Sequence, residues 1–384
     1  MGAADRQQAA RPPASGAGEI VQYDAQLRDA VLALQLLAYP HRRRDWIAPR
    51  WDWMFLQSAA RIGEPPKAWF YRDSDGVHAQ RAAIMVRLQA GKEVLVAGWL
   101  VDTVVLERLR GKSIGAALVE RATRTLPVSL SLGQTEHIRV LQDRCGWRAV
   151  ASMRSWLLVL GPRAAFLGRL RRAVQRVPLA TAAWGWQSLL RLAWTRSTRH
   201  QARHVHHFGP SHDRLWGAVR SQYRCTVVRD ASYLNWKYVD QPGQVFRRLE
   251  LVDHVGDVHG ICIWRVHEAD ATHAYRRGWV LDLVVDHQRA DLVHALLEAL
   301  IADARDQSID VIEMDLLAPD LSPSLRRGGW IRTRATRHLR VSAPDTSAAT
   351  AALLLEPGAW YLTRGDSDGD HPWWTRAGRQ APGA

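Results

Sequence analysis

The sequence contains two copies of one pattern, and this repeat limits most strongly what the chain can fold into. Residues 99–105 read WLVDTVV and residues 279–285 read WVLDLVV, each a β-branched run with a central aspartate. Each run is followed by a predicted helix, a short strand and a second helix that ends at a Gly-Trp pair, Gly146-Trp147 or Gly329-Trp330. Two matching pairs in the same order indicate an internal duplication.

The elements around the repeat predict the fold class. Segments in which apolar and polar residues alternate precede each copy and are typical of an antiparallel meander. The copy itself adds a strand, a helix, a strand, a helix and a strand. We therefore predict an α/β (α+β) protein of two units, each a mixed, largely antiparallel sheet flanked by helices. The expected organisation is a disordered tail (1–18), a first unit (19–162), a basic helical connector (163–202), a second unit (203–364) and a tail (365–384).

Positive charge is concentrated between the two predicted units. The chain carries a net charge of +14, and residues 144–212 contain twelve arginines but no lysine, aspartate or glutamate. Residues 164–195 are predicted to be an amphipathic helix, broken near Pro178, that carries both arginines and tryptophans. Such a helix can pack between the units, bind an anionic membrane surface or bind a polyanion. Nucleic acid is the weakest of the three interpretations, and we expect peripheral membrane contact.

Cysteine usage and the N-terminus bear on the compartment. Cys145, Cys225 and Cys262 lie far apart and form no CxxC pair, which is typical of a reducing cytosol. The first 18 residues lack the apolar core of a signal peptide, and no segment is apolar enough to span a bilayer. The sequence therefore predicts a cytoplasmic protein, with attachment to the inner face of the membrane as an option.

A glycine-containing loop follows the first long predicted strand. Residues 106–118 read LERLRGKSIGAAL, so that Gly111 and Gly115 flank the expected start of a helix. Glycines at a strand-to-helix turn let backbone N–H groups approach an anion, and Arg110 and Lys112 add positive charge. A pyrophosphate is the expected ligand, although the loop matches neither GxxxxGK[ST] nor GxGxxG. An ordinary basic helix start is the alternative.

At this loop the sequence resembles the GNAT acyltransferase superfamily, whose acyl-CoA loop reads [QR]xxGx[GA] and is matched at Arg110–Gly115. The resemblance covers residues 20–160 and extends through the repeat to a degenerate second copy over 203–343. It implies acetyl-CoA or another acyl-CoA as co-substrate and direct acyl transfer to an amine. The contacts that it implies are Val104, Val105, Arg110, Gly111, Lys112, Ser113, Ile114, Gly115 and Ala116.

Two positions of the first copy and one segment of the second depart from the family pattern. Ser113 stands where the loop has its first glycine, which is tolerable if its backbone stays in the right-handed region. Gln142 stands where many members carry a tyrosine that protonates the thiolate, so that water or Tyr71 would be the donor. Residues 285–291 of the second copy have no glycine and place acids where phosphates would lie, which predicts a poor CoA binder.

Asp102 is the first candidate for the general base, because it lies mid-strand among apolar residues close to the predicted loop. Glu107 and Glu93 are further candidates. The alternative is a structural aspartate, which its recurrence at Asp282 favours. Trp236 and Tyr238 are predicted to line a groove for a sugar or lipid headgroup, with burial in the core as the alternative.

No metal site is expected, because His204, His206 and His207 have strand-like spacing and residues 366–377 lack the glycine and glutamate of a calcium loop. Residues 230–238 and 360–368 resemble features of bacterial tandem GNAT-like proteins that are encoded with surface-polysaccharide machinery. We therefore expect an acyl-CoA-dependent N-acyltransferase, with an amino sugar as its acceptor. A Fem-like aminoacyl-tRNA-dependent transferase and a non-catalytic GNAT-like scaffold are the alternatives.

Overall fold

The computed structural model describes residues 18–40, 42–161, 185, 200–270 and 273–369. We call residues 19–159 the N half and residues 201–363 the C half. The helix predicted over 164–195 lies outside the described residues, apart from Gly185.

The strands of the N half are β1 (Glu19–Gln22), β2 (Ala68–Asp73), β3 (Gly76–Ala90), β4 (Glu93–Val105), β5 (Val128–Leu132) and β6 (Arg148–Val159). Its helices are α1 (Arg28–Ala38), α2 (Arg44–Trp51), α3 (Ser58–Arg61), α4 (Ile114–Thr125) and α5 (Glu136–Arg144). Short turns of 3-10 or π-helix are η1 (Ala25–Leu27), η2 (Asp52–Gln57) and η3 (Glu107–Leu109).

The strands of the C half are β7 (Gln201–His204), β8 (Cys225–Val227), β9 (Arg247–Val252), β10 (Val258–His267), β11 (Arg277–Val285), β12 (Val311–Leu317), β13 (Ile331–Ser342) and β14 (Leu362–Thr363). Its helices are α8 (Pro210–Val219), α9 (Ala231–Tyr238), α10 (Ala290–Asp306), α11 (Ser322–Arg327) and α12 (Ala348–Leu354). Its short turns are η6 (Arg220–Gln222), η7 (Pro319–Leu321) and η8 (Pro357–Ala359).

All these strands join one 14-stranded sheet with the order β1-β2-β3-β4-β5-β13-β6-β12-β11-β10-β9-β7, while β8 pairs with β3 and β14 with β12. Outward from the central pair β13–β6, the strands on one side (β5, β4, β3, β2 and β1) correspond in order to those on the other side (β12, β11, β10, β9 and β7). The pairs β4–β5 and β11–β12 are parallel, and their neighbours are antiparallel. The predicted fold class, a mixed and largely antiparallel sheet flanked by helices, is confirmed.

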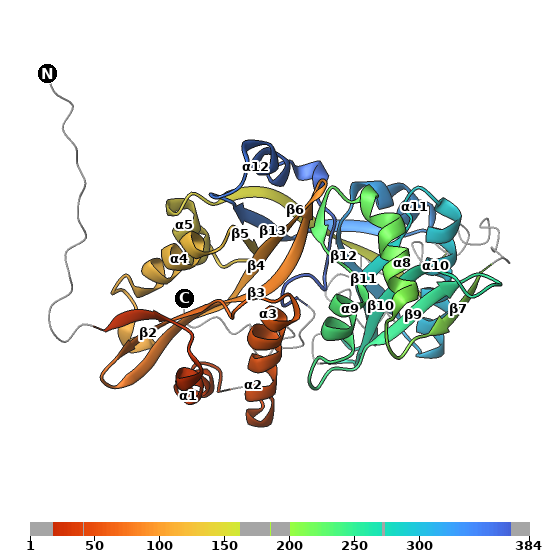
Figure 1. Ribbon diagram of the computed structural model, residues 1–384. Helices are drawn as coiled ribbons and strands as arrows, with labels where there is room; N and C mark the ends of the chain where they lie inside the picture. The colour runs from red at the N-terminus through yellow and green to blue at the C-terminus, as the bar shows by residue number, and fades with distance from the viewer. Residues whose placement is uncertain (1–17, 41, 162–184, 186–199, 271–272, 370–384) are drawn as a thin grey trace, which may run out of the picture.

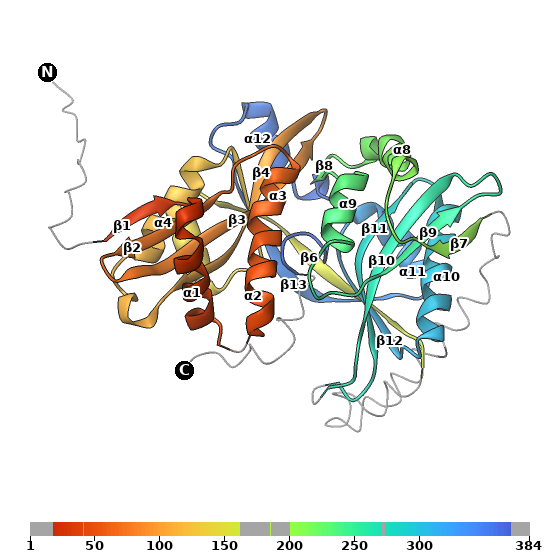
Figure 2. The same cartoon turned by 60° about the horizontal axis from the view of Figure 1, so that its bottom comes forward.

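Strand β6 of the N half and strand β13 of the C half each pair with strands of the other half. Strand β6 lies between β13 and β12, and β13 lies between β5 and β6. Figure 2 shows these two strands crossing between the two groups of elements. The division of the chain into units at residues 162 and 203 stays a prediction, and the pairing adds that neither half completes its sheet alone.

Helices cover both faces of the N-half strands, as Figure 1 shows. Helix α4 presents Ile114, Leu118 and Ala122 at helical spacing to one face, where they pack with Ala83 and other residues of β3. Helices α1 and α2 cover the opposite face, whose β3 residues alternate with those under α4. Strand β4 pairs with this covered strand from Glu93 to Val105, which positions the end of β4.

Candidate acyl-CoA site

Strands β4 and β5 run side by side only briefly. Ala97, Gly98 and Trp99 pair with Val128, Ser129 and Leu130, while β4 continues to Val105. Beyond Trp99, no strand of the described chain pairs with this edge of β4. On that edge the Val105 carbonyl accepts a hydrogen bond from Arg110 Nε at 3.4 Å. The other backbone N–H and C=O groups of the edge pair with no described strand, so that an extended ligand can add to the sheet there as a further strand would.

A β-bulge bends β4 along this free edge. Gln80 pairs with Val104 and Ala82 with Val101, so that Asp102 and Thr103 together oppose Arg81. Asp102 has φ +47°, in the left-handed region that aspartate tolerates better than most side chains. Bulges of this kind redirect a strand and are frequent next to binding sites.

Two arginines hold the bulge through the Asp102 carboxylate. Arg42 Nη2 lies 3.2 Å from Oδ1 and Arg50 Nη1 lies 3.1 Å from Oδ2, and all three side chains are buried. Burial by itself would raise the pKa of Asp102, but the charges of Arg42 and Arg50 and their hydrogen bonds hold it well below its usual range. Asp102 is thus a fixed anion in this structure.

The backbone of the bulge is also tied to the helices. Gln80 Nε2 donates to the carbonyl of Asp102 at 3.3 Å, and Gln80 Oε1 accepts from Gln35 at 3.0 Å and Trp51 at 3.2 Å. Because Gln35 belongs to α1 and Trp51 to α2, both helices fix the position of the bulge.

Asp282, the counterpart of Asp102 in the repeat, has the same kind of environment. Its Oδ1 accepts from Arg229 Nε at 2.9 Å and its Oδ2 accepts from the Tyr238 hydroxyl at 2.9 Å. A buried aspartate–arginine contact thus recurs in both halves, which favours a positioning role. The general-base role of Asp102 stays a prediction, and a carboxylate with so low a pKa accepts protons poorly.

The loop after β4 brings the predicted cofactor residues together. Val104 and Val105 end the strand, Arg110 to Ser113 are exposed, and Ile114 to Ala116 form the first turn of α4. Among the described residues no side chain caps this helix, and its first turn contains no acid. Its first backbone N–H groups therefore remain free to bind an anion.

The other base candidates lie at the two ends of β4. Glu107 is exposed in η3, on the same loop as the cationic residues. Glu93 lies at the opposite end of the strand, where it accepts a hydrogen bond from Thr350 at 2.9 Å. The structure thus brings Glu107 close to the loop and keeps Glu93 away from it.

Ser113 does not have the right-handed backbone conformation under which a serine was expected to be tolerable at this position. Its φ of +59° lies in the left-handed region, where a Cβ is strained and glycine is not. We expect Ser113→Gly to raise the free energy of unfolding by about 0.5–1 kcal/mol, because relief of this strain outweighs the extra entropy of the unfolded chain. Urea denaturation measures the change, and a destabilised variant would contradict this explanation.

A groove of about 390 Å³ lies between α4 and α5, next to this helix start. It is lined by Ala116, Glu120, Thr123, Arg124, Leu141, Arg144 and Cys145. Gln142 of α5 follows the groove residue Leu141 in the sequence and is fully buried. Neither the nitrogen nor the oxygen of its amide has a hydrogen-bond partner among the described residues. Buried amides normally have partners, but Gln142 does not line the groove, so that its amide is not exposed to a ligand there.

The sequence suggested Trp236 and Tyr238 as substrate contacts and Tyr71 as a proton donor, and in the structure each of them has other contacts. Trp236 stacks on Trp53 with ring centroids 5.0 Å apart, and each indole N–H donates to the other residue's backbone carbonyl. Trp236 and Tyr238 are both buried in the core, as the alternative interpretation expected. The hydroxyl of Tyr71 accepts from the Gly18 N–H at 3.1 Å, and β3 separates its strand from β4.

The corresponding opening in the C half is filled by the chain itself. Strand β14 pairs with the end of β12, and the Gly365 N–H donates to the carbonyl of Leu281 at 2.7 Å. Leu281 is the extra residue of the bulge in β11. In addition, Asp291 in the first turn of α10 pairs with Arg289 at 2.7 Å, so that a carboxylate already occupies this helix start. The C half therefore offers no equivalent anion site.

Within the described part of the chain, no group of three or more histidine, cysteine or acidic residues is placed to hold a metal ion. No helix among these residues has both the length and the apolar character needed to cross a bilayer.

No family model matches the sequence, and neither does any curated protein. Several solved structures have a similar fold. An Enterococcus faecalis protein described as a probable N-acyltransferase aligns with a TM-score of 0.59 at 8% identity, over 85% of this chain and 73% of its own. A GCN5-related N-acetyltransferase from Anabaena variabilis aligns with a TM-score of 0.58 at 10% identity, over 84% of this chain and 72% of its own.

Saccharomyces cerevisiae N-myristoyltransferase, solved with bound myristoyl-CoA, aligns with a TM-score of 0.55 at 12% identity, over 90% of this chain and 85% of its own. At such identities the likeness concerns the fold. The chain thus shares the fold of these N-acyltransferases, and its function must be argued from the site.

Proposed function

We propose that the chain is an acyl-CoA-dependent N-acyltransferase whose N half binds the acyl-CoA. The observation that carries this proposal is the contrast between two equivalent openings. The opening between β4 and β5 ends at a cationic loop and an uncapped helix, whereas the one between β11 and β12 contains β14 and an acidic helix start.

The residues present fit an acyl-CoA. The N–H groups at the start of α4, with Arg110 and Lys112, would hold the pyrophosphate. The free edge of β4 would pair with the amides of the pantetheine arm, and a backbone N–H near Val104 would donate to the thioester carbonyl. When bound, the acyl-CoA supplies the thioester that an amine can attack.

The ion pairs of Asp102 give these residues their fixed positions. Because Arg42 and Arg50 hold the bulge from α1–α2, the N–H groups after it point in a constant direction, which is what stabilisation of a developing oxyanion requires. Deprotonation of the amine is assigned to Glu107 or to water, since the Asp102 carboxylate forms ion pairs with Arg42 and Arg50.

The proposed acceptor is an amine. An amino sugar is the first class to test, in keeping with the resemblance of residues 230–238 and 360–368 to tandem proteins of surface-glycan synthesis.

Titration calorimetry with acetyl-CoA and with longer acyl-CoAs tests the proposal. We expect micromolar binding of at least one of them, followed by release of free CoA when an amine from a panel is added. Binding weaker than the millimolar range for every chain length would contradict the proposed cofactor. Binding without turnover of any amine would favour the non-catalytic alternative.

A further inference from the structure

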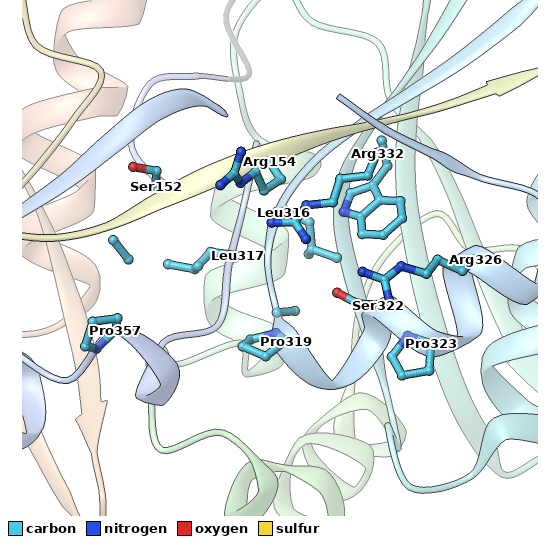
Figure 3. Close-up of a pocket in the computed structure, with 13 residues that line it drawn as sticks. Ser152, Arg154, Leu316, Leu317, Pro319, Ser322, Pro323, Arg326, Arg332 and Pro357 are labelled. Atoms are coloured by element: carbon cyan, nitrogen blue, oxygen red, sulfur yellow. The ribbon is translucent and has the colours of Figure 1, made fainter. Parts of the chain in front are cut away.

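A second groove, of about 600 Å³, lies between β6, the end of β12 and the start of α11 (Figure 3). It is lined by Ala151, Ser152, Arg154, Trp156, Leu316, Leu317, Ala318, Pro319, Ser322, Pro323, Arg326, Arg332 and Pro357. Its volume is in the range of pockets that hold small molecules. We call it the arginine groove.

Three arginines give this groove its charge. Arg154, Arg326 and Arg332 are exposed, and within the described residues none of them pairs with a carboxylate. Figure 3 shows them around the same hollow, with Arg154 and Arg332 above Leu316 and Arg326 to its right. Other arginines of the C half do pair with acids, as Arg364 does with Asp315 at 2.9 Å. Three unpaired guanidinium groups beside apolar side chains favour a ligand that carries a phosphate group.

The charge is not a consequence of the repeat. Helix α5, the counterpart of α11, carries Glu136 in its first turn, whereas the first turn of α11 contains no acid. The arginines come from three separate elements, with Arg154 on β6, Arg326 on α11 and Arg332 on β13. Only the fold brings them together.

One end of the arginine groove approaches the opening between β4 and β5. Ser152, at this end, has its hydroxyl oxygen 2.7 Å from Nδ1 of His338 on β13. The backbone carbonyl of His338 accepts from the N–H of Gly133 at 3.3 Å, and Gly133 directly follows β5. The groove thus ends one strand away from the point where β5 leaves β4.

We propose that the arginine groove binds the phosphate group of the acyl acceptor, so that the substrate is a phosphorylated amine. The inference rests on the proposed function. Arg154, Arg326 and Arg332 hold the phosphate, and the amine lies toward Ser152. The amine nitrogen bonds to the acyl carbon as the C–S bond breaks, the proton lost from nitrogen ends on the thiol, and the phosphate is unchanged.

Calorimetry with glucosamine 6-phosphate, glucosamine and inorganic phosphate tests the inference. We expect the wild type to bind glucosamine 6-phosphate and not glucosamine. Arg326→Gln and Arg332→Gln should each weaken this binding at least tenfold. Arg327→Gln is the matched control, because Arg327 is exposed on the same helix but does not line the groove. It should bind as the wild type does.

An equal loss in Arg327→Gln, or phosphate bound as tightly as the phosphorylated amine, would overturn the inference. Acetyl-CoA is titrated into the same proteins, and we expect its affinity to be unchanged by Arg326→Gln. If acetyl-CoA binds and the phosphorylated amine does not, the acceptor inference fails while the proposed function stands. If the phosphorylated amine binds and no acyl-CoA of any chain length does, the proposed function fails and the role of the groove as an acceptor site fails with it.

Discussion

Gly115→Glu is expected to weaken acyl-CoA binding at least a hundredfold while the protein stays folded. A Cβ at residue 115 would lie 3.7 Å from Val105 and 3.9 Å from Leu141, which is ordinary van der Waals contact. A carboxylate in the first turn of a helix is favourable, by about 0.3–1 kcal/mol. The same carboxylate would repel a pyrophosphate at the N–H groups of α4. The loss of binding would then reflect charge at the site and not unfolding.

The control for this variant is Gly217→Glu. Gly217 is exposed in α8, and a Cβ there meets no described atom within 4 Å. Both variants receive the same side chain in a helix, but only Gly115 lies at the proposed pyrophosphate site. Calorimetry with acetyl-CoA should separate them. Unchanged affinity in Gly115→Glu, or equal losses in both, would contradict the assignment of the loop.

The loop could be predicted because its signal is local. Arg110, Gly111, Lys112 and Gly115 lie within six residues, and the repeat placed a strand before them and a helix after them. The backbone angle of Ser113 could not be predicted, because it depends on how α4 packs under the end of β4. A serine in the sequence does not reveal a φ of +59°.

The partners of Asp102 could not be predicted, because they are distant in the sequence. Arg42 and Arg50 precede Asp102 by 60 and 52 residues, and the other 50 of the 52 lysines and arginines are equally possible partners from the sequence alone. The recurrence of the aspartate at Asp282 was visible and favoured a structural role, but it did not reveal that buried arginines are the shared partners. Only the packing of α1–α2 against the bulge identifies them.

The exchange of β6 and β13 between the halves is also hidden from the sequence. Each strand has the same alternating pattern whether it pairs within its own half or with the other. The arginine groove depends on this exchange, because Arg154 and Arg332 come from the two exchanged strands. Likewise, the aromatic character of Trp236 and Tyr238 fits a sugar site or a core, and only the position of α9 decides between them.

Asp102→Asn is expected to lower the free energy of unfolding by about 3 kcal/mol, because it removes the carboxylate that two buried arginines share. Asparagine tolerates a positive φ as well as aspartate does, so that the bulge itself is not disfavoured. Asp282→Asn is the matched variant and should cost less, since Arg229 keeps its contact with Asp366 at 2.7 Å. Urea denaturation of the three proteins at neutral pH measures both changes.

The pH dependence of the difference between wild type and Asp102→Asn provides a second test. Because the folded-state pKa of Asp102 is lowered, its contribution to stability is fully present above its unfolded-state pKa of about 3.9 and is lost as the pH falls below it. The stability difference should therefore be constant near neutral pH and shrink in acid. A variant that lost activity but less than about 1 kcal/mol of stability would contradict the positioning role, since a broken buried ion pair costs more. It would instead favour Asp102 as the base.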